Sequence, residues 1–74
     1  MDPAEVAVLA VLHPDRTMTT AQIREASALT ARQIRNALAR LESRGLIMSS
    51  QPRGRWRISA YGRAAFRTKG KRYG

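Results

Sequence analysis

Arginine and amide side chains recur along residues 30–44, and these residue types can read the edges of DNA bases. Arginine can pair with O6 and N7 of guanine, and asparagine with N6 and N7 of adenine. At about 100° per helical residue, one face of a helix would carry Arg32, Asn36, Ala39 and Ser43. The only acid of the segment, Glu42, falls to one side of that face. Gln33, Arg35 and Arg40 flank that face. The DNA-binding residues that we predict on this helix are Arg32, Gln33, Arg35, Asn36 and Arg40.

A polar helix face alone is weak evidence, because every surface helix has one. The surrounding sequence favours insertion into a DNA groove. A capped helix and a tight turn precede the segment, and a basic hairpin follows it. Most of the polar residues occupy the N-terminal half, which is the half that recognition helices usually insert.

The basic hairpin has its tip at residues 51–55, where a turn carries proline second and glycine fourth. The residues predicted to contact DNA there are Arg53, Gly54, Arg55 and Arg57. Arginines beside a glycine can enter a minor groove or hold phosphate. The alternative is a solvated hairpin whose charges only protect its strand edges.

Two further groups could bind the DNA backbone. Thr19, Thr20 and Gln22 begin a predicted helix and could donate hydrogen bonds to phosphate oxygens, a role compatible with capping that helix. Lys69, Lys71 and Arg72 lie in a segment without an apolar pattern, residues 68–74, which we interpret as a flexible basic tail.

The charge distribution points to a polyanionic partner. Fourteen Lys and Arg face five Asp and Glu, for a net charge of +9. Residues 45–74 hold eight of the basic residues and no acid. DNA, RNA and an anionic membrane would all fit this asymmetry. The membrane is the weakest option, since no helix pairs a strong apolar stripe with a lysine-rich face.

The elements that would position these residues follow the order helix, helix, helix, strand, strand, helix. Asp2 and Pro3 begin a helix that runs to Leu12, and Glu5 could complete its capping box. A loop over residues 14–18 follows. The second helix spans residues 19–28, with Thr19 and Gln22 at capping-box spacing and Ile23 and Ala26 facing inward. The third spans 30–44 and carries the apolar stripe Ile34, Ala37, Leu38 and Leu41. Thr30 and Gln33 have capping-box spacing at its start, and Gly45 follows it where a left-handed residue ends a helix. A turn of two or three residues, 28–30, separates the second and third helices, as in a helix-turn-helix.

The C-terminal half would form strands at residues 46–48 and 55–59, then a helix over 60–67. Packing residues expected in that helix are Tyr61, Ala64, Ala65 and Phe66. Trp56 is assigned to the core rather than to base stacking, and Met18 and Met48 to filling gaps. The fold class is therefore mainly α with a small β-hairpin, forming one domain over residues 1–67.

Catalysis finds no support in the sequence. His13 is the only histidine and ends a helix, cysteine is absent, and the acids are scattered. Nothing forms a nucleophile–base pair or a set of metal ligands. We expect no enzymatic activity, no cofactor and no metal, and the missing cysteines fit a cytoplasmic protein.

The chain resembles the winged helix-turn-helix superfamily, and most of all small MarR-like and PadR-like repressors. The resemblance rests on the third helix running into Gly45-Leu46-Ile47, on the turn Arg53-Gly54-Arg55, and on Tyr61-Gly62-Arg63. It implies sequence-specific binding of double-stranded DNA, with residues 51–55 as the wing. Such repressors usually carry extra helices for dimerisation or ligand binding. These are missing here, so no small-molecule ligand is expected. A single recognition surface is small, which favours a homodimer at least on DNA.

Other classes remain open at this point. Winged helices also serve as protein-interaction modules, although a partner-binding face would be less charged than residues 45–74. Arginine-rich wings and tails also suit sequence-tolerant DNA architecture. RNA binding is less favoured, because a two-stranded hairpin lacks paired exposed aromatics.

Overall fold

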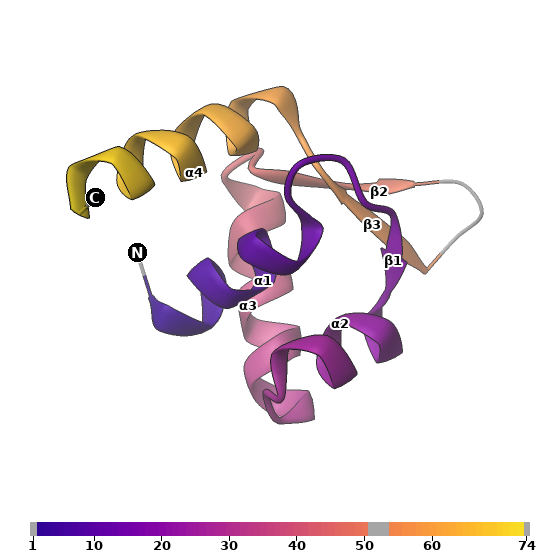
Figure 1. Cartoon of the computed structure of the whole chain (residues 1–74). Helices are drawn as coiled ribbons and strands as arrows, with labels where there is room; N and C mark the ends of the chain where they lie inside the picture. Colours follow the sequence, from indigo (N-terminus) through magenta and orange to yellow (C-terminus); the bar gives the residue numbers. More distant parts are fainter. Residues whose placement is uncertain (1, 51–53, 74) are drawn as a thin grey trace.

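Three antiparallel strands and four helices make up the part of the chain that the structure describes (Figure 1). The structure is a computed structural model that describes residues 2–50 and 54–73, with side chains described as far as Arg67. In chain order its elements are α1 (Pro3–Leu12), β1 (Met18–Thr19), α2 (Thr20–Ser27), α3 (Ala31–Ser43), β2 (Ile47–Ser50), β3 (Arg55–Ile58) and α4 (Ala60–Tyr73).

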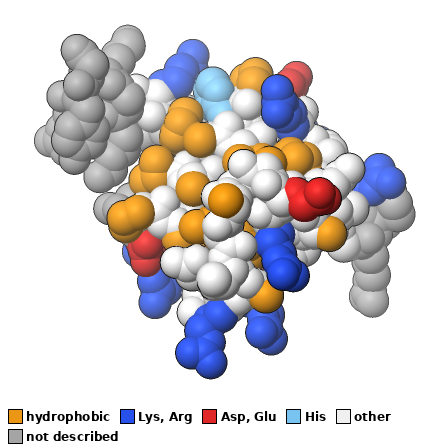
Figure 2. All heavy atoms as spheres, turned by 60° about the horizontal axis from the view of Figure 1, so that its bottom comes forward, with side chains coloured by type: hydrophobic (Ala, Val, Ile, Leu, Met, Phe, Trp, Pro, Cys, Tyr) orange, Lys and Arg blue, Asp and Glu red, His pale blue; other side chains and the backbone are white. Residues whose placement is uncertain are grey.

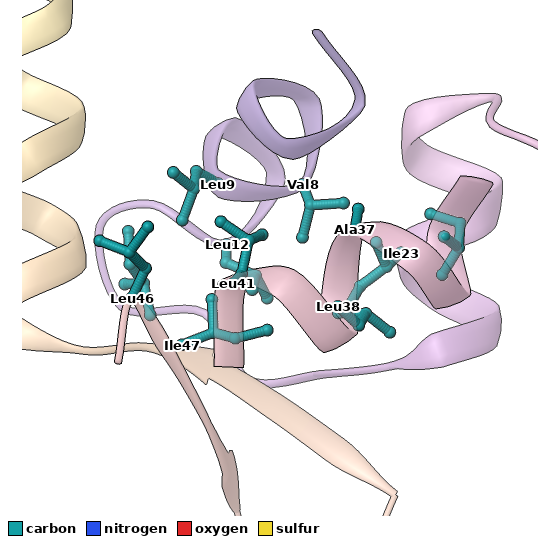
Figure 3. Close-up of a cluster of buried hydrophobic side chains, with 11 residues drawn as sticks. Val8, Leu9, Leu12, Ile23, Ala37, Leu38, Leu41, Leu46 and Ile47 are labelled. Carbon is teal, nitrogen blue, oxygen red and sulfur yellow. The ribbon is translucent and has the colours of Figure 1, made fainter. Parts of the chain in front are cut away.

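The core forms where α1 packs against α3. Figure 3 shows leucines of α1 pointing toward Leu41 of α3, with Ile23 of α2 and Ile47 of β2 closing the cluster. The predicted stripe of α3 is buried at all four positions: Ile34, Ala37, Leu38 and Leu41. One face of α3 is thereby fixed inside the protein, so the opposite face must point to solvent.

The start of α1 departs from the prediction at one residue. Asp2 caps the helix as expected, since its Oδ1 accepts a hydrogen bond of 2.9 Å from the Ala4 N–H. Glu5 does not complete a capping box. Its side chain is buried and its Oε2 lies 3.2 Å from Nη1 of Arg44, at the end of α3. A buried carboxylate needs a charged partner, and Arg44 offers a stronger one than the helix terminus.

Both helices of the helix-turn-helix pair begin with a complete capping box, as predicted. Thr19 and Gln22 exchange hydrogen bonds with each other's backbone N–H groups, and Thr30 and Gln33 do the same. Ala28 ends α2 with φ 59°, in the left-handed region. The reversal between the helices is therefore made by an alanine, where glycine would adopt the same φ more easily.

The sheet contains a strand that the sequence pattern did not reveal. Its order is β1-β3-β2, with Met18 opposite Trp56 and Ile47 opposite Ile58. We predicted a loop at residues 14–18 and a two-stranded hairpin. A strand of two residues has no alternation to detect, and β1 exists because β3 offers its free edge to it. This pairing fastens the hairpin to the start of α2.

Three predicted packing residues point outward instead. Ala26 is exposed because α2 turns Ile23 and Ser27 inward, and the Ser27 hydroxyl donates to the Ile23 carbonyl. Tyr61 and Ala64 are exposed because α4 packs through Ala65 and Phe66, the other two residues predicted to pack.

Two methionines predicted to fill gaps in the core differ in their exposure. Met48 is exposed on the outer face of β2, so it fills no core gap. Met18 is half-buried against the core, as expected. The ring of His13, which ends α1 as predicted, lies 5.0 Å from that of Phe66.

The start of α4 is held against the residues that follow α3 by Ser59 and Gly62. The Ser59 hydroxyl donates to the Gly45 carbonyl at 2.6 Å and accepts from the Gly62 N–H at 2.9 Å. A β-carbon at Gly62 would overlap the Leu46 carbonyl oxygen, so only glycine fits there. Gly45 itself has φ 75°, as predicted for the residue after α3.

The helix α4 extends to Tyr73, beyond the end predicted near Arg67. Lysine and arginine are good helix formers even without an apolar pattern, and packing of the first turns supplies the nucleus. Within the described residues, no helix is both long enough and apolar enough to span a lipid bilayer.

Candidate nucleic-acid interface

The exposed side of α3 carries three of the predicted DNA-binding residues in an open position. The side chains of Arg32, Arg35 and Asn36 are exposed, and none of them forms a hydrogen bond or ion pair with any residue that the structure describes. All three lie in the N-terminal half of the helix, Arg32 and Asn36 opposite the buried stripe and Arg35 beside them. Their donors and acceptors are therefore available to an external partner.

Gln33 is a capping residue as well as a predicted DNA-binding residue. Its Oε1 accepts a hydrogen bond of 2.9 Å from the Thr30 N–H, within the capping box of α3. The side-chain amide N–H₂ still faces solvent, since the residue is exposed. Capping thus holds the side chain close to the helix start and limits how far it can reach.

Arg40 is held by an acid of the same chain. Its Nη1 lies 3.3 Å from Oδ2 of Asp2, and both side chains are about half exposed. One turn later, Arg44 contacts Glu5. The outward face of α3 therefore has a free N-terminal half and a C-terminal half linked to the first turn of α1. Composition and spacing gave no signal of these pairs, because they join residues 38 and 39 positions apart.

The start of α2 is linked to the hairpin through a tryptophan. Nε1 of Trp56 lies 3.2 Å from Oγ1 of Thr20, so the indole N–H donates to that hydroxyl. The ring is half-buried against the core, which confirms its assignment there. Among the predicted backbone-binding residues, Thr19 and Gln22 are engaged in capping, and Thr20 keeps its hydroxyl proton for another acceptor.

The hairpin presents its arginines on the outer face of the sheet. Arg55 and Arg57 alternate with the inward-facing Trp56 and Ile58, as predicted, and both are exposed. Arg55 lies opposite Thr19 of β1 and Ser50 of β2. Gly54 is exposed with φ 89°. Arg53 lies outside the described residues, as do the side chains of Lys69, Lys71 and Arg72.

The distribution of charge is visible in Figure 2, where the lower end of Figure 1 is turned forward. Several arginine side chains project from the lower part of this view, and the acidic side chains lie higher up or at the sides. Across the described residues, no three His, Asp or Glu side chains gather as metal ligands would. A hollow on α2 and the turn that follows it is lined by Ala21, Arg24, Glu25, Ala28 and Leu29.

Comparison with known proteins identifies the family and the fold of this chain. The sequence pattern of a family described as "winged helix DNA-binding domain" matches residues 1–62. No curated protein sequence matches the chain. Among solved structures, BpsR of Bordetella bronchiseptica, whose DNA binding is regulated by 6-hydroxynicotinic acid, superposes with a TM-score of 0.83 at 22% identity. That match covers 92% of this chain and 51% of BpsR.

Two further solved structures have the same fold. The MarR family transcriptional regulator SPO1453 from Silicibacter pomeroyi DSS-3 has a TM-score of 0.80 at 22% identity, covering 92% of this chain and 50% of its own. A "probable transcriptional regulator" from Pseudomonas aeruginosa has a TM-score of 0.75 at 25% identity, covering 99% and 63%. This chain therefore spans between half and two thirds of the length of these neighbours.

Proposed function

We propose that this chain, which belongs to the family of winged helix DNA-binding domains, regulates transcription by binding specific sites on double-stranded DNA. In this proposal α3 enters the major groove, and Arg32, Arg35 and Asn36 contact base edges. Gln33 and Arg40 would contact the flanks of the same site. In this proposal the chain catalyses no reaction and acts in the cytoplasm.

One observation carries the proposal: the outward face of α3 is exposed and free of acids at its N-terminal half, while the inward face is locked in the core. A rigid helix loses little conformational entropy when it binds, so its polar side chains can be used for recognition. Arg32 and Arg35 have no ion pair within the described residues, so binding of DNA need not break one.

The hairpin and the start of α2 supply backbone contacts in this proposal. Arg55 and Arg57 are exposed on the sheet beside the α2 terminus, which supports a wing that grips phosphate or a narrow minor groove. Thr20 would donate its free hydroxyl proton to a phosphate. Arg53, Gly54 and the basic residues Lys69, Lys71 and Arg72 are proposed as further contacts from their sequence alone.

The decisive experiment is selection of bound duplexes from a random library at physiological salt. A regulator enriches a defined motif, and its affinity falls steeply with rising salt because phosphate contacts release counterions. Salt-dependent binding without a motif would instead indicate sequence-tolerant coating of DNA. Tight binding to a protein with weak salt dependence would indicate an interaction module.

We also propose that two copies bind DNA together. The solvent-facing side of α1 carries Pro3, Val6 and Ala10, all exposed and all apolar. Half-buried Ala7 and Val11 continue this strip, and no charged side chain interrupts it after Glu5. An apolar strip of this kind fits a partner helix better than water. No effector is proposed for this chain, and the regulation of BpsR by a small acid remains a property of that protein.

A further inference from the structure

The pair formed by Asp2 and Arg40 joins the cap of α1 to the outward face of α3. Asp2 uses its two oxygens separately: Oδ1 accepts from the Ala4 N–H at 2.9 Å, and Oδ2 accepts from Nη1 of Arg40 at 3.3 Å. Arg40 follows Asn36 by one helical turn, so it lies next to the free N-terminal half of the face. An acid of the protein thus occupies a guanidinium at the proposed interface.

The second pair, between Glu5 and Arg44, differs in burial. The Glu5 side chain is 3% exposed, against 42% for Asp2. Removing Arg44 from Glu5 would leave a buried charge without compensation, which is strongly unfavourable. Removing Arg40 from Asp2 costs little, because water can solvate the exposed carboxylate. Only the Asp2 pair can therefore open when another anion competes for its arginine.

We propose that Asp2 competes with DNA phosphate for Arg40 and thereby limits binding that does not depend on base sequence. This inference rests on the proposed function, since it needs a duplex at the outward face of α3. When DNA arrives, Arg40 exchanges the carboxylate for a phosphate oxygen, and Asp2 becomes solvated while still capping α1. Phosphate contacts carry no sequence information, so the competition lowers affinity for all duplexes alike.

The test is the substitution Asp2→Asn in the full chain. Asparagine caps helices as well as aspartate does, so α1 keeps its first turn while Arg40 loses its carboxylate. We expect Asp2→Asn to tighten binding to random-sequence duplex by about two- to fivefold, the range that an exposed ion pair allows. The gain should be equal for the selected site, leaving the preference between sequences unchanged.

A double-mutant cycle separates competition from simple charge repulsion. In an Arg40→Ala background, Asp2→Asn should have no effect on affinity, because the competed arginine is gone. Glu42→Gln is the matched control: it removes the same charge from an exposed α3 carboxylate that has no ion pair with any described residue. It should leave binding nearly unchanged.

Each contrary outcome overturns the inference. An equal gain from Asp2→Asn with and without Arg40, or an equal gain from Glu42→Gln, would show repulsion by net charge. No gain from Asp2→Asn in a protein that binds duplex would leave the proposed function intact and remove only the competition. If the unmodified chain bound no duplex, both proposals would fall together.

Discussion

Three side chains on one helix carry the proposed sequence preference. Arg32, Arg35 and Asn36 have no partner among the described residues, so their hydrogen-bonding groups remain available. A hydrogen-bonded contact to a base edge discriminates between bases, whereas a phosphate is the same at every base pair. Substitutions on this face should therefore alter the preferred sequence as well as the affinity.

We expect Arg32→Ala or Asn36→Ala to weaken binding to the selected site by about 1–3 kcal/mol and to relax preference at one or two base pairs. The measurement is competition between the selected duplex and single-base variants of it. Arg16→Ala is the matched control, because it removes an exposed arginine from the loop between α1 and β1 that is not assigned to the interface. If Arg32→Ala left the preference unchanged, groove insertion of this face would be wrong.

At the scale of elements, the turn between α2 and α3 sets how the two helices cross. Ala28 holds φ 59°, a conformation that costs a non-glycine residue about 1 kcal/mol. Its side chain is exposed, so substitutions there test backbone conformation without disturbing the core.

Two substitutions at this turn should have opposite signs. Ala28→Gly should raise the free energy of unfolding by up to about 1 kcal/mol, because glycine adopts the left-handed region freely. Ala28→Val should lower it by about 1–2 kcal/mol, since a β-branched side chain is crowded there. Urea unfolding followed by circular dichroism measures both. Equal effects of the two substitutions would contradict the assigned conformation.

Local signals in the sequence predicted most of the elements. Both capping boxes, the turn at residues 28–30 and the stripe of α3 depend on neighbours within four positions, and all are confirmed. The strand β1 and the pairs of Glu5 and Arg40 depend on contacts between distant segments, which no local pattern encodes. The inward side of α4 is predicted correctly at Ala65 and Phe66 and wrongly at Tyr61 and Ala64, because the rotation of the helix depends on the close approach of Gly62 to Leu46.

The candidate site was predictable to the same extent. The exposed residues of α3 follow directly from the buried stripe, which predicts Arg32 and Asn36 on the outward face with Arg35 flanking them. The ion pair that separates Arg40 from the free N-terminal half of the face could not be predicted, because Asp2 and Arg40 come into contact only in the folded protein. The bond between Trp56 and Thr20 was missed for the same reason.

At the scale of the whole molecule, α1 belongs both to the core and to the surface. Val8, Leu9 and Leu12 are buried, whereas Val6 is 37% exposed. If the outer strip joins two copies, Val6→Glu should shift the protein toward monomer and reduce binding to a two-half-site duplex more than to one half-site. Sedimentation velocity gives the oligomeric state, and Ala26→Glu on the exposed side of α2 is the control. A protein that is already monomeric on DNA would exclude this interface.

The basic residues of the C-terminal segment belong to the same scale. Deleting residues 68–74 should weaken binding to all duplexes equally, since phosphate contacts are independent of sequence. The slope of the logarithm of the binding constant against the logarithm of the salt concentration should become less steep by about 0.9 for each phosphate that the shortened protein no longer neutralises. Thermal unfolding checks that the shortened α4 still packs. A weakening confined to the selected site would instead place base contacts in this segment.

The bond between the hairpin and α2 has a practical consequence. Trp56 is the only tryptophan of the chain, and its indole N–H donates to a hydroxyl that would itself meet phosphate. Ultraviolet emission of this single ring would therefore respond when a duplex arrives. Stopped-flow mixing of unlabelled protein with duplex could then measure the rate of binding. The signal would come from the place where β3 meets the start of α2.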